Sequence, residues 1–129
     1  MTPGDVFALV RRALDAHAYV TRREDALQAH VVEVLRGVAV LEISTEVIDS
    51  GGRFDVLVTT HGDRPMRIVL ELKVRASVAA VERQAQRYAM AHGIDGVAVV
   101  TTSRRLARHL ADLQELGGKP FAAIALRSW

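Results

Sequence analysis

The chain has 129 residues, of which 50% are hydrophobic and 25% charged, and its formal net charge is +2. This length suits one domain with a substantial hydrophobic core, and the composition excludes a largely disordered chain. The lack of cysteine excludes disulfides, cysteine–zinc sites and thiol nucleophiles, and no hydrophobic run is long enough to span a membrane. Because the N-terminal stretch does not resemble a signal peptide, we expect a single cytoplasmic domain over residues 1–129.

Two helices are expected at the N-terminal end. Residues 2–5, Thr-Pro-Gly-Asp, are typical of a helix start, and the first helix should extend to about His17. Residues 21–24 fit a capping box that opens a second helix, which should extend to about Arg36. Hydrophobic residues of this second helix follow the three-and-four spacing of a buried stripe, and Glu24 falls on the same stripe.

Three strands are predicted next, over residues 38–48, 53–60 and 66–74. In the first of them hydrophobic and polar residues alternate, which is typical of a strand with one buried face. Turns of a few residues, rich in glycine, separate the strands. Such short connections favour an antiparallel meander.

The remaining elements alternate between helix and strand. They are predicted as a helix over 77–92, a strand over 96–102, a helix over 103–116 and a last strand over 120–126. The strand–helix–strand unit that begins with the third strand should be a right-handed parallel crossover. The order ααβββαβαβ therefore predicts an α/β fold, with a mixed β-sheet flanked by helices on both sides.

Charged residues interrupt the third strand, which is otherwise hydrophobic. Glu71 and Lys73 are two residues apart and therefore share a face of the strand. Lys73 is also one of only two lysines, with Lys119, among 17 basic residues. If the second strand pairs with the third, Asp55 can approach Glu71 on that face. Burying such charges is unfavourable unless they are paired or bind a metal.

Two neighbouring carboxylates and a lysine point to a specific chemistry. The carboxylates repel each other unless a cation lies between them, and Mg²⁺ accepts carboxylate oxygens together with substrate phosphate. A bound metal can polarise a phosphate, and a nearby lysine can neutralise charge that builds up in the transition state. The set Asp55, Glu71 and Lys73 therefore suits metal-assisted hydrolysis of a phosphodiester bond.

These residues resemble the core motif of the PD-(D/E)xK nuclease superfamily. Asp55, followed after fifteen residues by Glu71-Leu72-Lys73, matches its D…ExK pattern. Gln84 and Tyr88 match the Q-x-x-x-Y signature of the RecB-type branch. Residues 24–102 fit the order of elements in the family's core, although Phe54 stands in place of the proline of the family name.

The resemblance implies a restriction-endonuclease-like fold and a metal-dependent deoxyribonuclease that hydrolyses DNA in processing, repair or recombination. Under this resemblance Asp55 and Glu71 bind Mg²⁺ or Mn²⁺, Lys73 is the catalytic lysine, and Gln84 braces the site. Glu24, where many RecB-type members carry a histidine, is then a metal ligand or lies beside the ligands. Tyr88 is expected to be structural, packed near the site with its hydroxyl tethered.

DNA is the partner that the resemblance implies, and no membrane partner is expected. The small size also fits a homodimer, as in Holliday-junction resolvases of the same superfamily. A different class of function stays open: a nuclease-fold module that binds nucleic acid without cutting it. Glu71 and Lys73 would then form a plain cross-strand ion pair.

Several other residues have two interpretations. Glu24 fits the capping box as well as the metal site. Glu42 and Glu46 fit a solvated strand face, with a smaller chance of contact with the site. No zinc site is expected, because the five histidines show no metal-ligand spacing. Five arginines fit either solvated surface or contacts with DNA phosphates, namely Arg83, Arg87, Arg104, Arg105 and Arg108.

Overall fold

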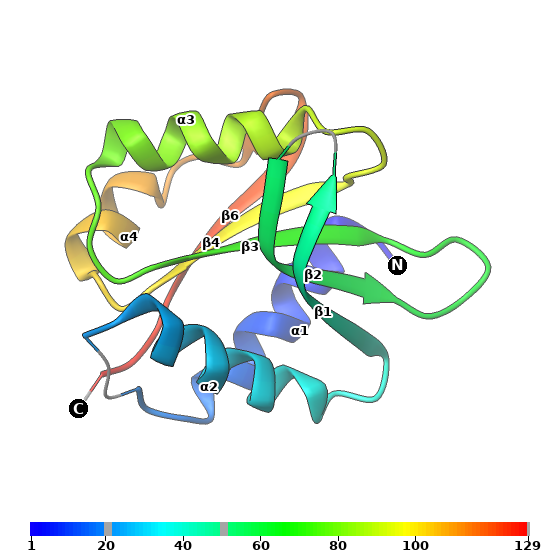
Figure 1. Cartoon of the computed structure of the whole chain (residues 1–129), viewed down its shortest axis with the longest axis horizontal. Helices are drawn as coiled ribbons and strands as arrows, with labels where there is room; N and C mark the ends of the chain where they lie inside the picture. The colour runs from blue at the N-terminus through cyan, green and yellow to red at the C-terminus, as the bar shows by residue number, and fades with distance from the viewer. Residues whose placement is uncertain (20–21, 50–51, 129) are drawn as a thin grey trace.

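A six-stranded mixed sheet forms the centre of the molecule, and helices cover both of its faces (Figure 1). The structure, a computed structural model, describes residues 1–19, 22–49 and 52–128. The helices and strands, in chain order, are α1 (Pro3–Asp15), α2 (Glu24–Arg36), β1 (Leu41–Asp49), β2 (Gly52–Thr60), β3 (Arg67–Lys73), α3 (Val78–Ala89), β4 (Gly96–Thr101), α4 (Arg104–Leu110), β5 (Glu115–Leu116) and β6 (Lys119–Ala125).

The strand order in the sheet is β1-β2-β3-β4-β6-β5. The pairs β1–β2 and β2–β3 are antiparallel, so the predicted meander is confirmed. The pairs β3–β4 and β4–β6 are parallel, and the connection through α3 is therefore the parallel crossover that the sequence predicts. β3 and β4 occupy the middle of the sheet, where strands are covered on both faces and carry mostly hydrophobic side chains.

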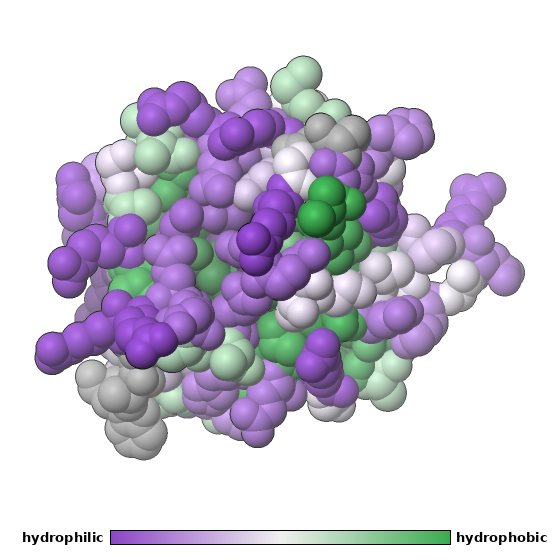
Figure 2. Space-filling model, viewed as in Figure 1, coloured by the Kyte–Doolittle hydropathy of each residue, from purple (hydrophilic) through white to green (hydrophobic). Residues whose placement is uncertain are grey.

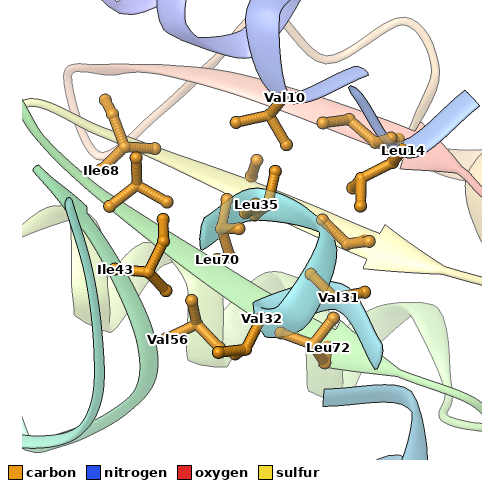
Figure 3. Close-up of a cluster of buried hydrophobic side chains, with 14 of the residues drawn as sticks. Val10, Leu14, Val31, Val32, Leu35, Ile43, Val56, Ile68, Leu70 and Leu72 are labelled. Atoms are coloured by element: carbon orange, nitrogen blue, oxygen red, sulfur yellow. The ribbon is translucent and has the colours of Figure 1, made fainter. Parts of the chain in front are cut away.

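Helices α1 and α2 cover one face of the sheet and α3 and α4 cover the other. Figure 3 shows the first face, where Val10 of α1 and Leu35 of α2 pack toward Leu70 of β3. On the second face Val69 of β3 joins a cluster with Val81 of α3 and other buried residues. Successive residues of β3 thus alternate between the two cores, and this alternation turns Glu71 and Lys73 toward the α3 side.

The start of α2 differs from the prediction. The helix begins at Glu24, with Arg23 in the N-cap position, so Glu24 is not the third residue of a capping box. Thr21, the predicted cap, lies outside the described residues. The interpretation of Glu24 as a capping residue is therefore wrong, and its carboxylate is available for other contacts.

The predicted helix over 103–116 is too long. α4 ends at Leu110, and β5 forms a hairpin with β6 through Gly117 and Gly118, which have φ angles of 57° and 78°. Glycine adopts such left-handed conformations readily. The sequence suggested a longer helix because Leu113 continues the hydrophobic spacing and still packs against the α3–α4 core. No helix in the described parts of the chain is long and hydrophobic enough to cross a membrane.

Lys119 has a structural role at the start of β6. Its Nζ donates hydrogen bonds to the carbonyl oxygens of Ala89 (3.0 Å) and Ile94 (2.6 Å), at and beyond the end of α3. Lys119→Met should leave both carbonyls without this donor and lower the free energy of unfolding by about 1–3 kcal/mol. Urea denaturation measures the change. Arg64→Met, at an exposed turn residue, is the control, and equal stability of both variants would contradict this role for Lys119.

Candidate functional site

Glu71 is the most deeply buried charged residue that the structure describes, with a side chain that is 0% exposed. Lys73 Nζ lies 3.0 Å from its Oε1, an ion-pair contact. Among the described residues neither carboxylate oxygen of Glu71 has a partner in good hydrogen-bond geometry. A buried carboxylate in this state is costly, because it has lost its water without gaining hydrogen bonds in return.

The surroundings of Glu71 disfavour its charged form. Burial raises its pKa, the contact with Lys73 opposes that rise, and the negative charges of Asp55 and Glu24 add to it, so that the pKa lies above its usual value. The site therefore holds more negative charge than its one lysine neutralises. A divalent cation would relieve this imbalance.

Lys73 stays protonated in this setting. Burial alone would lower its pKa, but the close contact and negative charge of Glu71, together with the charges of Glu24 and Asp55, outweigh burial and raise the pKa above its usual value. The Lys73 side chain is only 17% exposed, at the end of β3. It is therefore a fixed positive charge and hydrogen-bond donor at neutral pH, and it is not suited to act as a general base.

Glu24 lies within reach of this lysine. Its Oε1 is 3.8 Å from Lys73 Nζ, and its side chain is 44% exposed. The first residue of α2 is thus brought against the end of β3, so that Lys73 lies between carboxylates from a helix and a strand. Whether Glu24 binds a metal stays a prediction.

Asp55 lies beside Glu71 because of the register of β2 and β3. The last pair of the β2–β3 ladder is Val56 with Leu70, so Asp55 and Glu71 are the adjoining residues at the end of that ladder. Asp55 is half-buried, and its charge contributes to the raised pKa of Glu71. The structure therefore brings together the three residues of the D…ExK pattern, as the sequence suggested.

Gln84 and Tyr88 connect α3 to β2. Gln84 Nε2 donates to the Tyr88 hydroxyl (2.7 Å), which donates to the carbonyl oxygen of Arg53 (3.1 Å). The buried Tyr88 ring also packs edge-on against Phe54. In the described structure no hydrogen bond joins Gln84 to Asp55, Glu71 or Lys73. These two residues thus hold β2 just before Asp55.

Three further residues lie near Asp55: Gln28 and Arg53, which were not expected at the site, and Glu46, for which contact with the site was the lesser alternative. Gln28 Nε2 lies 3.4 Å from the carbonyl oxygen of Asp55 and 3.5 Å from Glu46 Oε1. Glu46 forms an ion pair with Arg53. The one signal in the sequence is that Gln28 lies a helical turn after Glu24, on the same inward stripe. Glu42 and Glu46 are both exposed, as residues of a solvated strand face would be.

The side chains present fit a hard divalent cation. Glu71 and Asp55 offer carboxylate oxygens, the ligand type of Mg²⁺ and Mn²⁺, and both oxygens of Glu71 lack hydrogen bonds within the described structure. No group of three histidine, cysteine or acidic residues among the described residues forms a ready-made metal cage. Glu24, Asp55 and Glu71 are therefore not brought together as one three-carboxylate group in the described structure, and binding of Mg²⁺, which usually takes one or two carboxylates, stays a prediction.

The arginines proposed for phosphate contact lie on exposed positions of α3 and α4. No ion pair or hydrogen bond joins their side chains to the Glu71 cluster in the described parts of the chain. The face in Figure 2 is mostly hydrophilic, with the hydrophobic side chains in separate patches. The role of these arginines stays a prediction for Arg83, Arg87, Arg104, Arg105 and Arg108.

Comparison with known proteins supports the fold. No protein-family model matches the sequence, and no curated protein matches it. A solved structure that it resembles is a repair endonuclease from Pyrococcus abyssi, with 17% sequence identity and a TM-score of 0.53. The similarity covers 86% of this chain and 50% of that chain, so this chain spans about half its length. The predicted fold class is therefore confirmed: a mixed sheet flanked by helices, shared with that endonuclease.

The burial of Glu71 predicts a dependence of stability on pH. Because its pKa is raised in the folded state, the metal-free protein should lose stability as pH rises above the ordinary glutamate value of 4.5. Glu71→Gln removes this titration. Thermal melts of both proteins are recorded in chelator at several pH values. The melting temperature of the variant minus that of the parent should increase from about pH 4 to about pH 7. If the difference between the two melting temperatures stays constant across this range, Glu71 has the same pKa in the folded and unfolded protein.

Proposed function

We propose that this chain is a metal-dependent nuclease of the PD-(D/E)xK superfamily, in its RecB-type branch, that hydrolyses phosphodiester bonds of DNA. The observation that carries the proposal is Glu71, fully buried and without hydrogen bonds in the described structure, beside Asp55 and Lys73. A plain ion pair at a sheet edge would not explain a carboxylate at the centre of the sheet with a second carboxylate beside it.

Asp55 and Glu71 would hold Mg²⁺ or Mn²⁺, with Glu24 as a further ligand or as the group that holds Lys73. When bound, the metal supplies a water of lowered pKa and stabilises charge on the phosphate. Gln84 and Tyr88 keep β2 in place before Asp55. Lys73, protonated and held by carboxylates, donates to the oxygen on which negative charge develops during attack.

DNA is the proposed substrate, and repair is the proposed context. The support comes from the fold shared with a repair endonuclease and from the exposed arginines of α3 and α4, whose guanidinium groups suit phosphate. Dimeric action, as in a junction resolvase, and a location in the cytoplasm belong to the same proposal. A binding module that does not cut is less well supported, because Asp55, Glu71 and Lys73 are all present and adjacent.

A panel of DNA substrates tests the reaction. The protein should cleave one or more of a duplex, a single strand, a flap and a four-way junction with Mg²⁺ or Mn²⁺, and EDTA should abolish the cleavage because Asp55 and Glu71 need the cation. Gel assays with labelled strands measure the products. Binding without cleavage across the whole panel would instead support the binding module.

The role of Lys73 can be separated from metal binding. Lys73→Ala should reduce the cleavage rate by about 10²–10³-fold, as expected for loss of a group that stabilises transition-state charge. Because Lys73 is not a metal ligand, Mn²⁺ should still bind, as measured by electron paramagnetic resonance. Lys73→Arg should restore the rate only in part, because the planar guanidinium group of arginine is larger than the ammonium group of lysine. Parental cleavage by Lys73→Ala would assign Lys73 to structure alone.

A further inference from the structure

The strand that carries Asp55 is interrupted at that residue. The β1–β2 ladder pairs Thr45 with Val56 and Val47 with Phe54, but it leaves out Glu46 and Asp55 between them. The β2–β3 ladder also stops at Val56, one residue after Asp55. The backbone of Asp55 therefore lacks the ladder pairing that fixes its neighbours on both sides.

The interruption changes which face of the sheet the side chains occupy. Phe54 and Leu57 are three residues apart, so a regular strand would place them on opposite faces. Both nevertheless pack in the α3–α4 core, whereas Val56 packs in the α1–α2 core. The strand thus reverses its faces at Asp55. On the partner strand the reversal coincides with Glu46, the single described non-glycine residue with a positive φ, at 55°.

A left-handed conformation at glutamate is unfavourable and persists only where its surroundings hold it. The contacts that hold it here converge from both faces of the sheet. From α2, the Gln28 amide faces the Asp55 carbonyl oxygen at 3.4 Å and Glu46 Oε1 at 3.5 Å. The guanidinium of Arg53 pairs with the Glu46 carboxylate, while the Arg53 carbonyl oxygen accepts from Tyr88 of α3.

We propose that Gln28 is a positioning residue that fixes the interruption of β2 and thereby directs the Asp55 carboxylate toward Glu71 and the cation. The inference rests on the metal site of the proposed function. The two Gln28 contacts are at the long end of the hydrogen-bond range, and catalytic contacts often shorten when a site is loaded. Gln28 is suited to this position because one amide group reaches both the main chain of Asp55 and the side chain of Glu46.

Gln28→Met tests the proposal, because methionine keeps the length of the side chain but cannot donate a hydrogen bond. We expect Mn²⁺ affinity, measured by electron paramagnetic resonance, to fall by about 10–100-fold, the range seen when groups that orient metal ligands are removed. In the metal-free protein the amide NMR signals of Glu46 and Asp55 should shift or broaden, because their main chain has lost its side-chain support. Gln86→Met, at an exposed position of α3, is the matched control and should change neither measurement.

The two measurements separate the possible failures. Parental Mn²⁺ affinity of Gln28→Met would overturn the positioning role, and so would unchanged amide signals of Glu46 and Asp55. A parent protein that binds no Mn²⁺ would overturn the metal site of the proposed function and, with it, the part of this proposal that concerns the cation. Loss of Mn²⁺ binding in Asp55→Asn, with retention in Gln86→Met, supports the metal site independently of Gln28.

Discussion

The buried carboxylate of Glu71 is the constraint around which the rest of the site is arranged. The centre of a mixed sheet is the part of an α/β protein least able to solvate a charge, and Glu71 lies there with an ammonium as its nearest compensation. Stability alone would favour a hydrophobic residue at this position. Binding of the proposed cation to Glu71 and Asp55 would offset this cost.

Two layers of helices hold this site from opposite sides of the sheet. α2 brings Glu24 to Lys73 and Gln28 to the interrupted part of β2, whereas α3 brings Tyr88 to the strand just before Asp55. The cores beneath them are hydrophobic and tightly closed, so these side chains start from rigid supports. The position of Asp55 relative to Glu71 therefore depends on packing in both layers.

Much of the fold and the centre of the site could be predicted from the sequence. Alternating hydrophobic residues and short turns predicted the meander, and the meander brought Asp55 next to Glu71. The start of α2 could not be predicted, because Arg23 gives no capping signal and Thr21 gave a misleading one. The β5–β6 hairpin could not be predicted, because Leu113 continues the hydrophobic spacing of a helix beyond the end of α4.

The interruption of β2 was also invisible in the sequence, for a different reason. A left-handed residue is normally indicated by glycine or asparagine, and here it is a glutamate in a strand. What holds Glu46 in that conformation comes from residues distant along the chain, Gln28 in α2 and Arg53 across the hairpin. Such support depends on tertiary structure, which local patterns do not report.

The same interruption has a consequence for the edge of the sheet. β1 is an outermost strand, and a long, straight outer strand is a template on which other chains can assemble into aggregates. Because Glu46 has a positive φ and its ladder pair is omitted, β1 is not a regular nine-residue template. On the opposite side β5 pairs with only the first two residues of β6, and the rest of β6 forms that edge. The interruption beside Asp55 thus also shortens the stretch of β1 on which another strand could pair without a break.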